Sequence, residues 1–278
     1  MDWLSALILG IVQGASEYLP ISSSGHLAIF REILGVDLPT DQSLQFDVMV
    51  HAATVLSTIV ILLPMFKRLL RGFFRFDGGP DFIYVCKILV SCIPVGIVGV
   101  FLKDYVEAIF GEGLSVVGIC LLVTALLLCF AYFSGIDRRT GKPRAADKGR
   151  DISWRDSFVI GCGQALAVLP GLSRSGTTIA TGILLGDKRE QVATFSFVMV
   201  ILPIVGEALL DLGKMLSPAA GAQGGGSVGA AAMIIGFVSA FLVGCAACKW
   251  MIALVKKGKL IWFAVYCATV GLLCLLWH

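Results

Sequence analysis

Two short segments place serine, glycine and ionisable residues inside otherwise apolar sequence. The first contains Glu17 and the run from Ser22 to His26, and the second runs from Ser173 to Gly176. In each segment the serine–glycine run follows a proline, Pro20 or Pro170, which interrupts the preceding helix. A helix that restarts after such a break presents free N–H groups and the positive end of its dipole, and both favour an anion. The two segments together therefore predict a site that handles phosphate.

Arg174 and Glu17 are the charged candidates within these segments. A guanidinium in apolar surroundings is costly unless it has a partner or a function, and its planar fork suits phosphate. Alternatively, Arg174 forms a structural ion pair with Glu17, and the two interpretations are compatible when no substrate is bound. Glu17 in turn could act as a general base, as a metal ligand or as the partner of Arg174.

His26 and the serines of the first segment could carry out the reaction itself. His26 could act as a general acid, as a nucleophile or as an orienting group. Each of Ser22, Ser23 and Ser24 could be a nucleophile or a phosphate donor, and we expect at least one of them to be a helix cap. The candidates for phosphate binding are Ser22, Ser24, Gly25, Ser173, Ser175, Gly176 and Thr178.

Three further polar residues, Gln13, Asp47 and His51, are candidates for supporting roles. Asp47 and His51 are four residues apart, so a helix would place them on one face. They either line the cavity or form a mutually satisfied pair near the outer membrane boundary.

The composition indicates which elements must position these residues. Of the 278 residues, 57% are hydrophobic and 15% are charged, whereas a soluble domain would have about 25% charged residues. Apolar runs long enough to span a bilayer recur, and because they are continuous they do not fit a transmembrane β-barrel. The expected spans are residues 44–65, 84–102, 114–134, 191–213, 230–250 and 259–277. We therefore predict an all-α integral membrane protein with about six transmembrane helices.

Lysine and arginine in the connections set the orientation, because cytoplasmic loops carry an excess of both. The basic connections are 66–83, 135–155 and 251–258, which places them in the cytoplasm and the C-terminus outside. Two interrupted apolar stretches, 3–34 and 156–185, then enter the membrane from opposite sides. We predict that they form two inverted re-entrant helical hairpins.

The two interrupted stretches also share an ordered motif. The pattern of glycine, glutamine, proline, serine and glycine between Gly10 and Gly25 recurs between Gly161 and Gly176. Internal symmetry with helix breaks at matching positions predicts an inverted-repeat fold with its site between the repeats. We predict a single membrane domain over residues 1–278, made of repeats at about 1–135 and 156–278 that are joined by a cytoplasmic loop, 135–155.

Both segments resemble the signatures of a known family. The run from Gln13 to His26, QGASEYLPISSSGH, resembles the first signature of bacterial undecaprenyl-diphosphatases of the bacitracin-resistance type, and the run from Pro170 to Ile179, PGLSRSGTTI, resembles the second. The resemblance covers the whole chain in length, span order and motif position. It implies a hydrolase that converts undecaprenyl diphosphate to undecaprenyl phosphate and inorganic phosphate. Such an enzyme renews the lipid carrier for peptidoglycan and other cell-wall polymers and confers bacitracin resistance.

The resemblance also implies roles for the matching residues. Glu17, Ser23, His26 and Arg174 would be catalytic, while Gln13 stands where other members carry glutamate. A divalent cation, Mg²⁺ or Ca²⁺, would be required, and Glu17 is the best candidate for a ligand. The protein would lie in the bacterial inner membrane with its site open to the outer, periplasmic side. It would bind a polyprenyl diphosphate lipid and no nucleic acid, and a homodimer is compatible with the sequence.

Three routes to hydrolysis are compatible with these residues. We favour attack by Ser23 after activation by Glu17 or His26, while the others use His26 as nucleophile or water with Glu17 as base. The main rival function is transport of a phosphate-bearing lipid, because inverted repeats with broken helices are common in transporters. A purely structural membrane subunit is disfavoured by the density of reactive side chains in the two segments.

Overall fold

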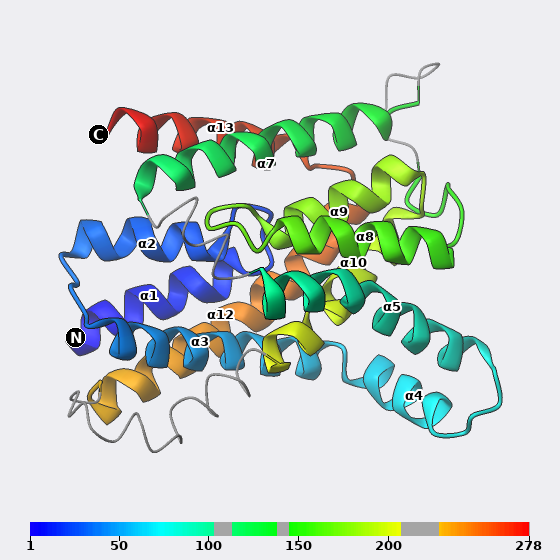
Figure 1. The fold of residues 1–278 in the computed structure, drawn as a ribbon, viewed down its shortest axis with the longest axis horizontal. Coiled ribbons are helices and arrows are strands. Elements are labelled where there is room, and N and C mark those ends of the chain that lie inside the picture. Colours follow the sequence, from blue (N-terminus) through cyan, green and yellow to red (C-terminus); the bar gives the residue numbers. More distant parts are fainter. Residues whose placement is uncertain (103–112, 138–144, 207–227, 278) are drawn as a thin grey trace.

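The computed structural model describes residues 1–102, 113–137, 145–206 and 228–277, and this part of the chain is helical (Figure 1). The helices are α1 (Trp3–Ser16), α2 (Ser23–Leu34), α3 (Thr40–Ile61), α4 (Leu63–Phe73), α5 (Pro80–Phe101), α7 (Leu114–Ser134), α8 (Trp154–Leu166), α9 (Arg174–Leu185), α10 (Arg189–Met199), α12 (Ala230–Lys256) and α13 (Ile261–Leu276). The predicted all-α class is confirmed.

Five helical segments among the described residues are long and apolar enough to cross a membrane. They are Gln42–Ile61, Pro80–Phe101, Leu114–Ser134, Arg189–Gly206 and Ala230–Lys256. They correspond to five of the expected spans, and the remainder of the expected span 191–213 lies outside the described residues, as do residues 138–144 of the basic connection. The orientation inferred from the basic connections stays a prediction.

Two expected spans differ from the structure. The span predicted at 259–277 is the 16-residue helix α13, whose length of about 24 Å falls short of a bilayer core of about 30 Å. The span predicted at 44–65 ends at Ile61, because Leu62 leaves helical geometry and Pro64 lies in the first turn of a new helix, α4. The connection predicted at 66–83 is therefore mainly helical.

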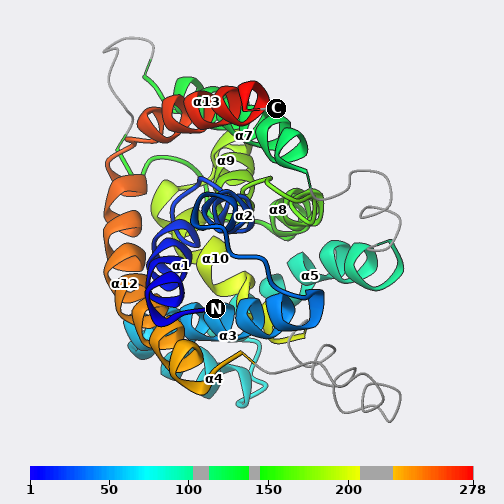
Figure 2. The ribbon, with the colours of Figure 1, turned by 90° about the vertical axis from the view of Figure 1, so that its left-hand side faces the viewer.

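Two helix–loop–helix pairs, α1–α2 and α8–α9, correspond to the two interrupted stretches. In Figure 1 their loops approach each other in the middle of the molecule from opposite ends. Seen end-on in Figure 2, α9 and α10 lie inside, with α12, α3, α5, α7 and α13 around them. Most side chains of α9 and α10 are accordingly buried. The arrangement brings both predicted segments to one place in the interior.

Each helix pair packs its first helix against the other half of the chain. Helix α1 packs on α12, and α8 packs on α5. A Cβ added at Gly10 would lie 2.0 Å from Ser239 Oγ, and one added at Gly161 would lie 2.2 Å from the carbonyl oxygen of Ser91. Gly10 and Gly161, which the sequence motif aligns, thus make equivalent close contacts between two helices, one in each half of the chain. The packing of α1 and α8 on helices of the opposite half supports the predicted inverted repeat, which stays a prediction.

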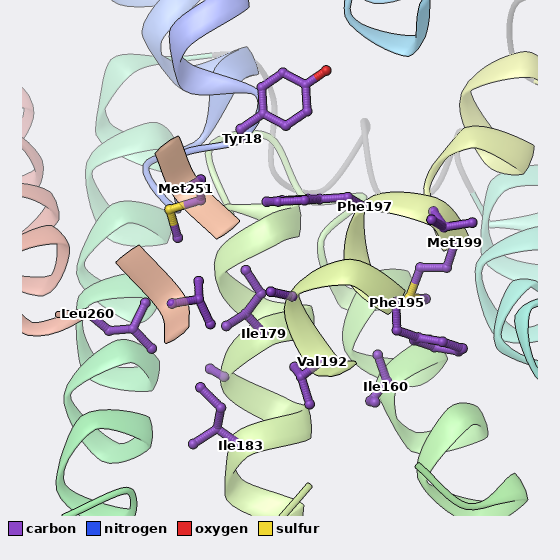
Figure 3. Packing of buried hydrophobic residues seen from close by; sticks show 14 of the residues in the cluster. Tyr18, Ile160, Ile179, Ile183, Val192, Phe195, Phe197, Met199, Met251 and Leu260 are labelled. Atoms are coloured by element: carbon purple, nitrogen blue, oxygen red, sulfur yellow. The ribbon is translucent and has the colours of Figure 1, made fainter. Parts of the chain in front are cut away.

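The largest buried cluster surrounds α9 and α10. Figure 3 shows Ile179 and Phe197 in this cluster, with Tyr18 at one end of it. Many large apolar side chains face outward instead, among them Leu126 on α7 and Ile234 on α12. An exposed apolar belt of this kind fits a protein whose solvent is lipid.

Candidate active site

Glu17 is the centre of a hydrogen-bonded cluster that joins both halves of the chain. Its Oε1 accepts from Nη2 of Arg174 at 2.8 Å, and its Oε2 accepts from Oγ of Ser23 at 2.8 Å and from Nε2 of Gln13 at 3.0 Å. Nε2 of His51 lies 3.7 Å from the same Oε2. The Glu17 side chain is buried, whereas that of Arg174 is 24% exposed. The guanidinium is therefore the more accessible partner for an incoming anion.

The loop that carries Glu17 is held in place by Tyr18. Its hydroxyl contacts the carbonyl oxygen of Thr54 at 2.6 Å and the hydroxyls of Ser57 and Thr58 at 2.5 and 2.8 Å. The ring packs edge-on against Phe197, at 5.4 Å between centroids. Because Tyr18 is buried against both α3 and α10, it fixes the position of the adjacent carboxylate.

The two helix breaks end in matching caps. Oγ of Ser22 accepts from the backbone N–H of Gly25 at 3.2 Å, and Oγ of Ser173 accepts from that of Gly176 at 3.1 Å. The prediction that a serine of the first segment caps a helix is confirmed for Ser22. Ser22 has a φ of 70°, which is unusual for a residue with a side chain and marks strained backbone beside the site.

The two caps determine which of the phosphate-binding candidates are available to a ligand. The N–H groups of Gly25 and Gly176 are occupied by the capping serines, so the earlier N–H groups of each first turn are the ones left for an anion. Ser24 is exposed at the start of α2, with its hydroxyl 3.4 Å from that of Ser22. The side chain of Ser24 is therefore available to a ligand.

The remaining candidates of the second segment bond within the protein. Oγ1 of Thr178 donates to the carbonyl oxygen of Arg174 at 2.9 Å and lies 2.5 Å from Oγ of Ser196. Oγ of Ser175 donates to the carbonyl oxygen of Leu19 at 3.2 Å, which links the two loops. In this structure Thr178 and Ser175 therefore hold α9 in place beside α10 and the first loop.

His26 is placed apart from the Glu17 cluster. Its Nδ1 lies 2.8 Å from the carbonyl oxygen of Ser22, and its Nε2 lies 2.8 Å from the hydroxyl of Tyr266. Both ring nitrogens thus have partners other than Ser23 and Glu17. Among the two candidate bases for Ser23, the geometry favours Glu17.

Asp47 and His51 do not form the pair that their spacing suggested. The carboxylate of Asp47 pairs with the guanidinium of Arg31 on α2. Nδ1 of His51 instead contacts the backbone carbonyl oxygen of Asp47 at 2.8 Å, which turns Nε2 toward Glu17. The expectation of a mutually satisfied side-chain pair is wrong, because the side chain of Asp47 pairs with Arg31 and Nε2 of His51 faces Glu17. His51 belongs to the site and Asp47 lies outside the Glu17 cluster.

A small cavity lies beside the Glu17–Arg174 pair. Its polar lining comes from Glu17, Tyr18, Thr54, Thr58, Arg174, Ser175 and Ser196, and its apolar lining from Val55, Phe197, Val200, Ile201 and Ile204. A ligand with a charged head and a hydrocarbon tail matches this division.

Sequence reasoning missed three residues that position the site: Tyr18, Ser196 and Tyr266. Tyr18 is adjacent to Glu17, and the polar residues at 54, 57 and 58 recur on one helical face, so a buried hydroxyl partner for α3 could have been inferred. Ser196 and Tyr266 contact partners on other helices, Thr178 and His26, and a single sequence gives no signal for these contacts.

Comparisons with known proteins agree with these motifs. The sequence model of the family described as bacitracin resistance protein BacA matches residues 6–273. The undecaprenyl-diphosphatase of Bacteroides thetaiotaomicron is 55% identical, over 98% of this chain and 97% of that protein. The undecaprenyl-diphosphatases of Parabacteroides distasonis and Methanosphaera stadtmanae are 54% and 34% identical over the same shares. The resemblance seen in the two serine-rich segments is thus confirmed along nearly the full length, and the chain belongs to the BacA family of bacitracin resistance proteins.

Proposed function

We propose that this protein hydrolyses undecaprenyl diphosphate to undecaprenyl phosphate and inorganic phosphate, and thereby renews the lipid carrier for cell-wall polymers and confers bacitracin resistance. Membership of the BacA family and the names of its relatives support the reaction. The observation that carries the mechanism is that one carboxylate, Glu17, contacts both a hydroxyl nucleophile and a guanidinium at 2.8 Å.

Arg174 binds the diphosphate in this proposal. Its guanidinium is partly exposed beside the cavity, and its fork suits two phosphoryl oxygens at once. The free first-turn N–H groups of α2 and α9 add further donors and the positive ends of two helix dipoles. These groups offset the charge that develops on the phosphoryl oxygens in the transition state.

Ser23 attacks the terminal phosphorus, and Glu17 accepts the proton from its hydroxyl. The new Oγ–P bond replaces the bond from phosphorus to the bridging oxygen, and undecaprenyl phosphate leaves. Water then attacks the phosphoserine and releases inorganic phosphate. The 2.8 Å contact between Ser23 Oγ and Glu17 Oε2 is the nucleophile–base distance that this step requires.

A divalent cation is a separate proposal, because it is implied by the family resemblance. In the described part of the chain, no group of three or more His, Cys, Asp or Glu side chains could hold a metal ion. Mg²⁺ can, however, be held by one or two carboxylates together with substrate phosphates. Glu17 fits as the single carboxylate of such a site, and the cation would neutralise charge on the diphosphate.

The remaining proposals concern the orientation of the protein in the membrane and its binding partners. The site opens to the periplasmic side of the inner membrane, the C-terminus is outside, and the prenyl tail lies along the apolar part of the cavity. The polyprenyl diphosphate is the partner, without nucleic acid, and a homodimer is compatible with the exposed apolar faces of the outer helices. Hydrolysis of a water-soluble short-chain polyprenyl diphosphate added to intact spheroplasts tests the side on which the site opens.

Phosphate release from undecaprenyl diphosphate by purified protein in detergent tests the function, since no transport can occur there. We expect release by the wild type with a divalent cation supplied, and loss of release by Arg174→Ala. No release by folded wild-type protein would reject hydrolysis and favour lipid transport.

The nucleophile is tested by trapping. With a ³²P-labelled terminal phosphate and acid quenching within milliseconds, labelled phosphoserine at position 23 is expected. Ser23→Ala abolishes the label and the turnover, whereas Ser43→Ala, which removes a half-buried hydroxyl on α3, keeps both. Turnover by Ser23→Ala at the wild-type rate would instead support direct attack by water.

A further inference from the structure

His26 is held between the two ends of the chain. Its Nε2 contacts the hydroxyl of Tyr266 on α13, 240 residues away in sequence, at 2.8 Å. The two rings also stack, with 5.6 Å between centroids and 18° between planes. His26 itself is buried, while Tyr266 is 42% exposed.

The partners of His26 determine where its proton lies. The carbonyl oxygen of Ser22, 2.8 Å from Nδ1, can only accept a hydrogen bond. Nδ1 of the neutral ring therefore carries the proton, and Nε2 carries a lone pair. The hydroxyl of Tyr266 is a donor that this lone pair can accept. The two groups therefore satisfy each other's hydrogen-bonding capacity.

We propose that Tyr266 is a positioning residue for His26, which rests on the proposed function of the same site. The carbonyl oxygen of Ser22 sets the tautomer, the hydroxyl of Tyr266 occupies the lone pair of Nε2, and the Tyr266 ring fixes the plane of the imidazole. In the resting state Nε2 therefore accepts a hydrogen bond from the hydroxyl of Tyr266. It is not free to attack phosphorus or to donate to a phosphoryl oxygen while it accepts from Tyr266.

Tyr266→Phe isolates the hydroxyl, because phenylalanine keeps the ring and its stacking. The matched control is Tyr132→Phe, which removes a hydroxyl from a half-buried tyrosine on α7. The chain has three histidines, so ¹⁵N-histidine labelling gives few signals. The signals that are missing from the spectrum of His26→Gln are those of His26.

Nitrogen NMR of the purified protein in detergent reads the tautomer without any turnover. In the wild type and Tyr132→Phe we expect a protonated Nδ1 and a hydrogen-bonded Nε2. In Tyr266→Phe the Nε2 signal should move toward that of a free lone pair. We also expect kcat to fall by about 10–100-fold with little change in KM, the size of effect seen when an orienting partner is lost.

The two readouts separate the inference from the function on which it rests. Unchanged His26 signals in Tyr266→Phe, or an unchanged kcat, would overturn the positioning role while leaving hydrolysis established. A wild type that releases no phosphate would reject the function, yet the NMR comparison with Tyr266→Phe would still show whether Tyr266 occupies the lone pair of Nε2.

Discussion

Replacing Glu17 with glutamine tests the centre of the site. Glu17→Gln keeps the shape of the side chain but removes the charge that pairs with Arg174 and the basic oxygen that accepts from Ser23, each at 2.8 Å. A general base contributes about 10²–10⁴-fold to a rate, and each tenfold corresponds to about 1.4 kcal/mol. We therefore expect kcat to fall by about 10²–10⁴-fold, or about 3–5 kcal/mol of activation free energy.

Glu17→Gln should lower the free energy of unfolding by less than it raises the activation free energy. Removing one partner of a fully buried ion pair costs about 3–5 kcal/mol. Arg174 is 24% exposed, so solvent in the cavity takes over part of the lost interaction. We expect a loss of roughly 1–3 kcal/mol, which thermal unfolding in detergent reports as a lower Tm.

Phosphate release at saturating undecaprenyl diphosphate is the assay, with rates divided by the concentration of folded protein. Glu32→Gln is the matched control, because it removes an exposed carboxylate from α2. We expect the control to keep the wild-type rate. Folded Glu17→Gln that turns over within about threefold of wild type, a difference under 1 kcal/mol, would refute the role of Glu17 as base.

Three further substitutions test how the fold supports the site. Tyr18→Phe loses its hydroxyl contacts to α3, so Tm should fall by a few degrees, and an unchanged Tm would contradict this role. Burial and the neighbouring Asp156 raise the pKa of Asp187 to about 6. The ionised form therefore destabilises the fold as pH rises from about 4 to 6. Asp187→Asn should raise Tm more at pH 7.5 than at pH 5, and equal shifts would argue against the raised pKa. Gly10→Val should prevent recovery of folded protein by size-exclusion chromatography because α1 meets α12 there, whereas Gly96→Ala, with open space around it, should not.

The helix breaks could be predicted from sequence, but the ends of the helices could not. Proline marks both breaks, and α1 ends at Ser16 and α8 at Leu166, each four residues before the proline. Hydropathy does not detect the break at Leu62, because apolar residues continue across Pro64 into α4. An apolar run reports burial in lipid or protein, whereas a helix end depends on backbone geometry.

The chemical members of the site were predictable and their supports were not. Glu17, Ser23 and Arg174 stand out because polar groups at membrane depth are costly and therefore rare. Tyr266 does not stand out, since a tyrosine in an apolar helix is ordinary and only the fold shows what its hydroxyl contacts. His51 was a candidate whose partner was misassigned, because its spacing from Asp47 gave no information about Glu17 on another element.

In the proposed mechanism, the resting pair of Glu17 and Arg174 links substrate binding to activation of the base. At an effective dielectric constant of 20, two unit charges at 4 Å attract by about 4 kcal/mol, so neither group is free for chemistry while they are paired. A diphosphate carries more negative charge than one carboxylate and can accept the guanidinium with two oxygens. When it displaces Glu17 from Arg174, the carboxylate keeps its contact with Ser23 and loses its cation. In the proposed mechanism the base thus becomes free only when substrate is present, and one buried carboxylate serves both partners.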